Sequence, residues 1–113
     1  LIPHLPAALP GSELLRAMAR ETISMVNDSV TAYVRQDVAL AERVMAADDT
    51  VDDYFDRVKR SLISSVARGD SDGEGTLDIL MVAKYFERIG DHATNIAEWV
   101  EFSVTGVHKE ETT

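Results

Sequence analysis

The chain contains no cysteine, which excludes disulfide bonds and metal sites built from thiolates. It has no run of about 18 apolar residues, so no segment of this sequence is predicted to span a membrane, and we expect it to be peripheral to a membrane at most. Basic residues are few, because 11 lysines and arginines stand against 20 acids, and the net charge of −9 opposes binding to nucleic acid. A metal ion would therefore be held by oxygen atoms or by His4, His92 or His108.

All three prolines lie in the first ten residues, where they break an apolar stretch that has no positive n-region. The sequence also begins without methionine, so we interpret residues 1–11 as a connector from upstream sequence. The polar residues 107–113 predict a flexible tail. The missing signal peptide and cysteines favour a cytoplasmic location. At 113 residues, of which 45% are hydrophobic, the chain fits one small domain with a modest core.

Apolar residues recur every three or four positions over two long stretches that come after the connector. The first stretch predicts a helix from Ser12, a suitable N-cap, to about Arg35. After the short link 36–37, in which Asp37 can cap the next helix, the second stretch predicts a helix of roughly 30 residues that ends near Arg68. A connection this short forces the two helices to lie antiparallel.

Residues 69–75 have low helix propensity and predict a loop. Their alternating acids do not match the pattern of an EF-hand calcium loop. A third helix is predicted from Thr76, as its N-cap, to about Thr105, where Gly106 ends it. The sequence thus predicts an all-α, up-down-up three-helix bundle over residues 12–106.

The third helix carries three apolar columns that repeat every seven residues and form its predicted buried stripe. Gly90 lies on this stripe, where glycine costs about 1 kcal/mol relative to alanine, and we interpret it as a position of close approach by a neighbouring backbone. Steps of three and four residues place a polar row on the opposite, outward side. The columns are Ile79, Phe86, Ala93 and Val100; Val82, Ile89 and Ile96; and Ala83, Gly90 and Ala97; the row is Glu87, Asp91, Thr94 and Glu98.

The second helix is also rich in acids, with six of them between Glu42 and Asp56. Rotations of 100° per residue place three of these, Asp48, Asp52 and Asp56, on one flank of the apolar face. Aspartate is a poor helix former and like charges one turn apart repel, so this density needs an explanation. Two remain open: a solvated acidic face, or a cation held between carboxylate oxygens. A groove shared by the second and third helices would bring both sets of acids to one patch.

The sequence from Glu87 to Glu98, E-R-I-G-D-H-A-T-N-I-A-E, resembles the signature helix of the PhoU family of phosphate-signalling regulators. The sequence from Asp48 to Asp52 resembles the other acidic motif of that family, in which Asp or Glu is followed by Asp after three intervening residues. The resemblance covers residues 12–106. Full-length members contain two tandem three-helix repeats, and this chain is most similar to the C-terminal one. Either the first repeat has been removed, or two copies associate as a homodimer to replace it.

The resemblance implies a metal site and a regulatory function. In the family the two acidic motifs bind metal, in some members as multinuclear iron or zinc clusters, so iron or zinc is favoured, with manganese, magnesium and calcium as alternatives. It further implies a cytoplasmic negative regulator of phosphate uptake and phosphate-starvation signalling that contacts the phosphate ABC transporter and a sensor histidine kinase and catalyses no reaction. The implied metal ligands are Asp48, Asp52, Glu87 and Asp91, with Asn95 and Glu98 as supporting ligands.

Two other functions are compatible with a helical bundle of this composition. The first is a carboxylate-bridged di-iron enzyme, but such sites use Glu-x-x-His pairs, and no glutamate in this sequence is followed by histidine three residues later. The second is a structural or dimerisation bundle whose acidic face is solvated and binds no metal. Stability that ignores added metal would favour this alternative, because an ion bound only by the folded state must raise stability.

Overall fold

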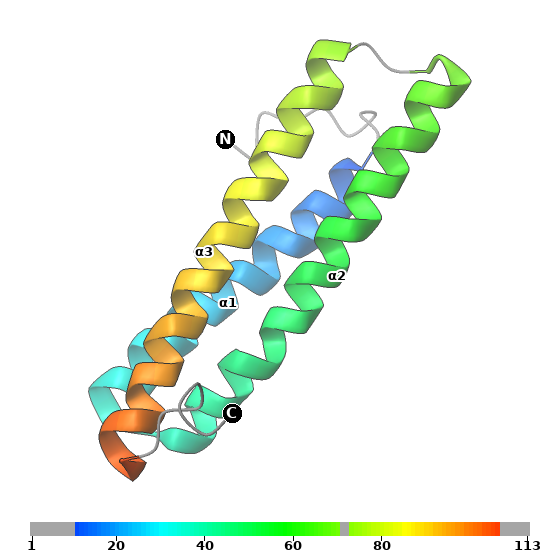
Figure 1. Cartoon of the computed structure of the whole chain (residues 1–113). Coiled ribbons are helices and arrows are strands. Elements are labelled where there is room, and N and C mark those ends of the chain that lie inside the picture. Colours follow the sequence, from blue (N-terminus) through cyan, green and yellow to red (C-terminus); the bar gives the residue numbers. More distant parts are fainter. Residues whose placement is uncertain (1–10, 71–72, 107–113) are drawn as a thin grey trace.

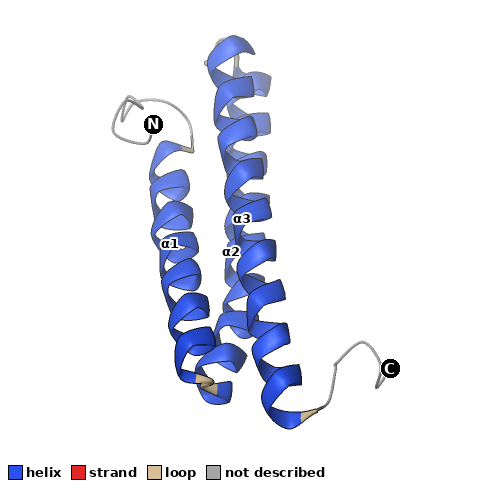
Figure 2. Cartoon of the chain, turned by 90° about the vertical axis from the view of Figure 1, so that its left-hand side faces the viewer, coloured by secondary structure: helices blue, strands red, loops and turns tan. Residues whose placement is uncertain are grey.

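The computed structural model describes residues 11–70 and 73–106, which form three helices and no strand. The helices are α1 (Ser12–Arg35), α2 (Val38–Arg68) and α3 (Gly73–Thr105). They lie side by side, with α2 antiparallel to both α1 and α3 (Figure 1). In Figures 1 and 2, α2 and α3 extend past the first turn of α1, so one end of the bundle consists of two helices. The predicted all-α, up-down-up bundle is confirmed.

The connection between α1 and α2 is held by a cap on each side. Gln36 takes a left-handed conformation with a φ of 56°, and its backbone N–H closes the end of α1 on the carbonyl oxygens of Ala32 and Tyr33. Asp37 begins α2 by accepting a hydrogen bond from the backbone N–H of Leu40 at 3.0 Å. The predicted cap at Asp37 is confirmed, and the short link turns the chain back along α1.

The predicted N-caps of α1 and α3 are both wrong. Gly11, with a φ of 77° that suits glycine, is the N-cap of α1, and Ser12 is already in the first turn. α3 begins at Gly73, so Thr76 lies inside the helix and the predicted loop is shorter. Glu74 stands in that first turn, where a carboxylate interacts favourably with the positive end of the helix and offsets the low helix propensity of glycine.

The C-terminal end of α3 agrees with the prediction. The helix ends at Thr105, and the backbone N–H of Gly106 donates to the carbonyl oxygen of Phe102 at 2.7 Å. The predicted tail and all but the last residue of the predicted connector lie outside the described residues, as do His4 and His108. No helix in the described part of the chain combines the length and apolar character needed to cross a membrane.

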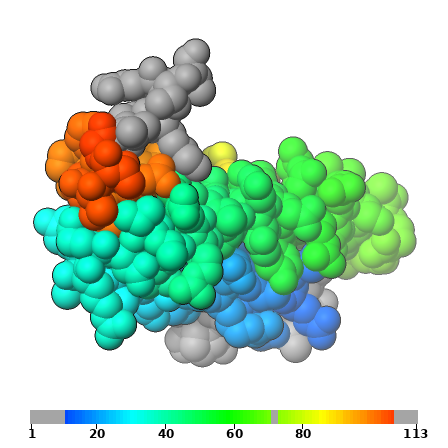
Figure 3. Space-filling model, turned by 90° about the horizontal axis from the view of Figure 1, so that it is seen from below, coloured from blue at the N-terminus to red at the C-terminus, as the bar shows by residue number. Residues whose placement is uncertain are grey.

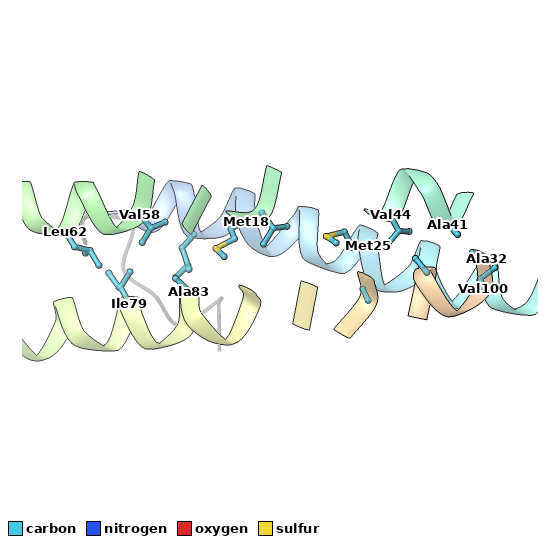
Figure 4. Close-up of a cluster of buried hydrophobic side chains, with 14 residues drawn as sticks. Met18, Met25, Ala32, Ala41, Val44, Val58, Leu62, Ile79, Ala83 and Val100 are labelled. Carbon is cyan, nitrogen blue, oxygen red and sulfur yellow. The ribbon is translucent and has the colours of Figure 1, made fainter. Parts of the chain in front are cut away.

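The hydrophobic core runs between the three helices along the bundle (Figure 4). Buried side chains recur at intervals of three and four residues, so one stripe of each helix faces the axis. Two of the three columns predicted for α3 are part of this core, those through Ile79 and Ala83. The buried core side chains are Leu15, Met18, Met25 and Ala32 on α1; Ala41, Val44, Val51, Val58 and Leu62 on α2; and Ile79, Ala83, Ala93, Ala97 and Val100 on α3.

The third column predicted for α3 is not buried. Ile89 and Ile96 are 41% and 38% exposed, and Val82 is half-buried. Ser103, which continues this column, donates a hydrogen bond to Oε1 of Gln36 at 3.2 Å, and Figure 3 shows the last turns of α3 against the connection between α1 and α2. The column therefore lies beside α1 at the edge of the α1–α3 contact, and two neighbouring helices cannot cover all three columns of α3.

Gly90 is a close contact point, but with side chains rather than with a backbone. A Cβ atom at Gly90 would lie 3.5 Å from Cγ1 of Val51 and 3.7 Å from Sδ of Met25. It would also lie 3.7 Å from Oδ1 of Asp48. These are ordinary van der Waals distances, so the predicted backbone approach is wrong. The same contacts show that Asp48 of α2 reaches the surface of α3.

Candidate metal centre

The acidic flanks of α2 and α3 meet in the groove between these helices. Asp48 and Asp52 stand one turn apart on α2, and Asp91 stands on α3. A carboxylate oxygen from each of them lies within 4.8 Å of those of the other two. We call these three residues the acidic triad. Within residues 11–70 and 73–106 it is the one group of acids or histidines placed to share an ion.

Asp48 is the most buried member of the acidic triad. Its Oδ1 is shielded from solvent, as is Oγ1 of Thr94, and neither atom makes a hydrogen bond of good geometry among the described residues, although the two side chains are close enough for a weak one. Burial is the main cause that raises the pKa of the Asp48 carboxyl, the charge of Asp91 is the next, and the nearby Thr94 hydroxyl lowers it. A buried polar atom without a partner costs about 1–3 kcal/mol and is uncommon. Asp48 and Thr94 are thus polar neighbours without a hydrogen bond of good geometry between them, and poorly satisfied buried atoms of this kind are compatible with a ligand.

Asp52 has a strongly perturbed carboxyl group. Asp52 is exposed overall, but partial desolvation of its carboxyl group in the groove is the main cause that raises its pKa from 3.8 to about 6, and the charge of Asp48 is the largest contribution from a neighbouring acid. Glu87 and Asp91 add to the shift, and a hydrogen bond with Glu87 acts in the same direction. The folded chain thus disfavours the ionised form of Asp52. A cation in the groove would have the opposite effect, because it favours the charged carboxylate.

Glu87 is a fourth carboxylate in this groove and does not point outward as predicted. Its side chain is only 18% exposed, and its Oε1 accepts a hydrogen bond from Nζ of Lys84 at 2.8 Å. The same ammonium group lies 5.3 Å from the ring centroid of Phe55 on α2. The column through Ile89 is not buried, so the buried stripe of α3 lies further round the helix than predicted. Glu87, on the other edge of this stripe, therefore faces α2.

Two acids on the solvent side of α2 form ion pairs with arginines. Asp53 pairs with Arg57 at 3.9 Å, one turn further along the helix. Asp56, which the sequence places on the same flank as the acidic triad, instead pairs with Arg60 at 3.3 Å and is exposed. The outward acids thus form surface ion pairs of an ordinary kind.

Glu98, one of the two supporting ligands predicted on α3, does not belong to the acidic triad. Asn95 is exposed and Glu98 is half-buried on the turns that come after Asp91. Neither Glu98 nor the exposed His92 belongs to the grouped side chains. The residue that reaches Asp48 is Thr94, which the sequence places in the same row but which we did not predict as a ligand. Its spacing of three residues from Asp91 was the available signal.

The chemistry of these side chains fits a cation bound by oxygen atoms. Carboxylates from two helices converge, and one of them, Asp48, presents a buried oxygen that makes no hydrogen bond of good geometry. Such a donor set suits iron, manganese, magnesium, calcium or zinc in a carboxylate-rich site. It contains no thiolate or imidazole, so it does not favour metals that require soft ligands.

Several known proteins are similar to this chain. Residues 15–100 match the PhoU domain. The chain is 33% identical over 97 residues to phosphate-specific transport system accessory protein PhoU homolog 1 of Thermotoga maritima. The aligned region covers 86% of this chain and 42% of that protein. It is 35% identical over 105 residues to a PhoU homolog of Caulobacter vibrioides, with 90% and 46% covered. A PhoU homolog of Clostridium acetobutylicum is 35% identical over 89 residues, with 79% and 41% covered.

The chain spans less than half the length of these relatives. No solved structure matches it. The matched region contains both acidic segments and most of the three helices that bring them together. On these grounds the chain belongs to the PhoU family.

Proposed function

We propose that this chain is a metal-binding regulatory adaptor of phosphate transport, in which the groove between α2 and α3 holds a metal ion or a multinuclear cluster. The observation that carries the proposal is the acidic triad, in which Oδ1 of Asp48 is shielded from solvent and makes no hydrogen bond of good geometry. Three ionised carboxylates at this distance repel one another, whereas a cation between them turns the same arrangement into an attraction.

The members of the acidic triad are the proposed direct ligands, with Glu87 as a fourth carboxylate. Asn95 and Glu98, on the next turns of α3, are proposed as supporting ligands of a larger cluster. The PhoU family favours iron or zinc, and the donor set also suits manganese, magnesium and calcium. The metal would supply positive charge that links α2 to α3. The chain's own residues hold it in place and carry out no reaction.

The metal content of purified protein without an affinity tag tests the site. Wild-type protein should carry metal, and the double variant Asp52→Ala with Asp91→Ala should lose it. A matched control replaces two acids of α2 that do not belong to the triad, Asp49→Ala with Asp53→Ala, and changes the net charge by the same amount. Unchanged metal content in the first double variant would refute the site assignment.

Thermal unfolding separates this proposal from the alternative of a structural bundle with a solvated acidic face and no metal. An ion at 100 times its Kd stabilises the folded state by about 2.7 kcal/mol when it does not bind the unfolded chain. Added iron, zinc or manganese should therefore raise the Tm of the wild-type protein but not of the variant without Asp52 and Asp91. A wild-type Tm that ignores all three metals would favour the structural alternative.

The regulatory part of the proposal is supported by the relatives, whose names describe accessory proteins of a phosphate-specific transport system. We infer a negative regulator of phosphate uptake and phosphate-starvation signalling that acts in the cytoplasm, without catalysis, through contacts with the phosphate ABC transporter and a sensor histidine kinase. Because the chain spans less than half of these relatives, its binding should be measured alone. The metal-loaded chain should bind the transporter or the kinase, and failure to bind either would refute an adaptor role for this chain.

An exposed apolar strip along α1 and α3 favours a homodimer. Residues at spacings of three, four or seven form it on these helices, and each of its six side chains is at least 38% exposed. The hydrogen bond between Ser103 and Gln36 shows that these two helices lie side by side at one end of the strip. Contiguous exposed apolar surface of this kind marks interaction sites. The apolar strip consists of Ile23 and Val30 on α1 and Tyr85, Ile89, Ile96 and Trp99 on α3.

A second copy of this chain is the proposed occupant of the apolar strip, because the strip contains no acid although the chain carries a net charge of −9. The ionisable side chains on the same side of α3 are Arg88 and His92, so two copies can meet here without opposing carboxylates. The wild-type mass in solution should be that of a dimer, and Ile89→Glu should give a monomer. Ile63→Glu, an exposed position on α2, should leave the dimer intact. A monomeric wild-type protein would contradict this proposal.

A further inference from the structure

Lys84 is tied to the groove between α2 and α3 by two contacts. Its Nζ donates to Oε1 of Glu87 at 2.8 Å and lies 5.3 Å from the ring centroid of Phe55. Phe55 stands one turn after Asp52 on α2, and Glu87 precedes Asp91 by one turn of α3. The ammonium group is therefore held between the two helices at one end of the acidic triad.

The charge of Glu87 acts on the acidic triad directly. It raises the pKa of both Asp48 and Asp52, so Glu87 interacts electrostatically with both of these acids. Lys84 reaches the four carboxylates through Glu87, which among the described residues is the one of them with an ion pair. An oxygen atom that accepts the hydrogen bond of an ammonium group is not fully available to a metal ion, because both interactions use its lone pairs.

We propose that the ammonium group of Lys84 neutralises Glu87 in the metal-free chain and that the metal ion replaces it as the partner of Glu87. Metal binding in this groove is then an exchange of one cation for another. The inference rests on the proposed function, since it requires an ion in the groove. In the metal-free chain Nζ neutralises Glu87, which is mostly buried, while the lysine side chain is 60% exposed. When Glu87 turns to the ion, the ammonium group loses its partner and moves into solvent. The exposed side of α3 then carries a free positive charge only in the metal-bound state.

Replacing Lys84 by methionine tests the exchange. Lys84→Met keeps a flexible apolar chain over Phe55 and removes the ammonium group. The Kd for zinc, measured by isothermal titration calorimetry, should fall by about fivefold, the upper end of what a surface ion pair contributes. The matched control Arg88→Met removes one charge from the same helix, four residues away, and should change the Kd by less than about twofold.

A second background separates exchange from general electrostatics. In Glu87→Gln protein the partner of Lys84 is neutral, so adding Lys84→Met should change the zinc Kd by less than about twofold. If Lys84→Met still lowers the zinc Kd about fivefold in the Glu87→Gln protein, the exchange is wrong. It is also wrong if Lys84→Met and Arg88→Met change the zinc Kd equally. Weaker zinc binding by the Lys84→Met protein would also overturn it, because Lys84 would then support the ion.

Chemical accessibility gives a direct readout of the released ammonium group. Acetylation of Lys84 by acetic anhydride should become faster when zinc binds, relative to acetylation of Lys59 in the same sample, and an unchanged ratio would contradict the exchange. The two proposals fail differently. Wild-type protein that binds no zinc would refute the metal site itself. If Asp52→Ala with Asp91→Ala abolishes zinc binding but Lys84→Met leaves the zinc Kd unchanged, only the exchange is refuted.

Discussion

Replacing Asp52 by asparagine should stabilise the metal-free protein at neutral pH, although it removes a residue of the proposed site. The pKa of Asp52 rises from 3.8 to about 6 on folding, so the folded state binds this proton more tightly than the unfolded chain. As the pH increases from about 4 to 6, the unfolded chain releases the proton first. The free energy of unfolding therefore falls over this window, and the loss is complete above both pKa values.

The size of the effect depends on the shift and on the exposure of the side chain. One pKa unit corresponds to 1.36 kcal/mol, so the full shift gives an upper value of about 3 kcal/mol. Asp52 is exposed, and solvent screening reduces the contribution to about 1 kcal/mol. Asparagine resembles the protonated acid and cannot ionise. At pH 7.5 the Asp52→Asn protein should therefore be about 1 kcal/mol more stable than wild type, and the difference should vanish near pH 4.

Urea unfolding in the presence of EDTA, at intervals from pH 4 to 8, measures this difference. Asp53→Asn is the matched control, because Asp53 pairs with Arg57 and its replacement should bring no gain at pH 7.5. Added zinc should reverse the order, since the wild type binds it more tightly. If Asp52→Asn is less stable than wild type at pH 7.5 without metal, or if the difference is the same at every pH, the electrostatic reasoning is wrong.

Three further predictions use the same assays. Gly90→Ala should raise the free energy of unfolding by about 0.5–1 kcal/mol, because the added Cβ meets no atom closer than 3.5 Å, but its methyl group near Oδ1 of Asp48 should weaken zinc binding in calorimetry. Asp37→Ala should lower the free energy of unfolding by about 1 kcal/mol in urea, through loss of the α2 cap. EDTA should lower the Tm of metal-loaded protein more at pH 7.5 than at pH 5, because protons compete with the ion for Asp52 at the lower pH.

The positions of the helices could be predicted because their determinants are local. Apolar spacing within each helix, the side chain of Asp37 and the glycine after α3 act over one or two turns. The start of α3 was missed for a related reason. Thr76 is a good N-cap residue, but Glu74 favours a helix that has already begun, and the sequence alone does not weigh one against the other.

The rotation of α3 could not be predicted, because it depends on the other two helices. Three of its columns are apolar, and only packing against α1 and α2 decides that the column through Ile89 stays at the edge. That choice moves Glu87 from the expected outward row into the groove. Lys84 was overlooked for the same reason, since a lysine three residues before a glutamate is an ordinary surface pair on any helix.

The acidic triad differs from Asp53 and Asp56 of α2 in a way that stability alone does not explain. Asp53 and Asp56 each have an arginine one turn further on, so this helix supplies counter-charges to two of its solvated acids. The triad and Glu87 place four carboxylates together, and within residues 11–70 and 73–106 they have one partner cation, Lys84. A penalty of about 1 kcal/mol is a sizeable part of the stability of a small domain. Proteins keep such locally unfavourable groups where function requires them, and a bound cation is the ligand that converts this repulsion into cohesion between α2 and α3.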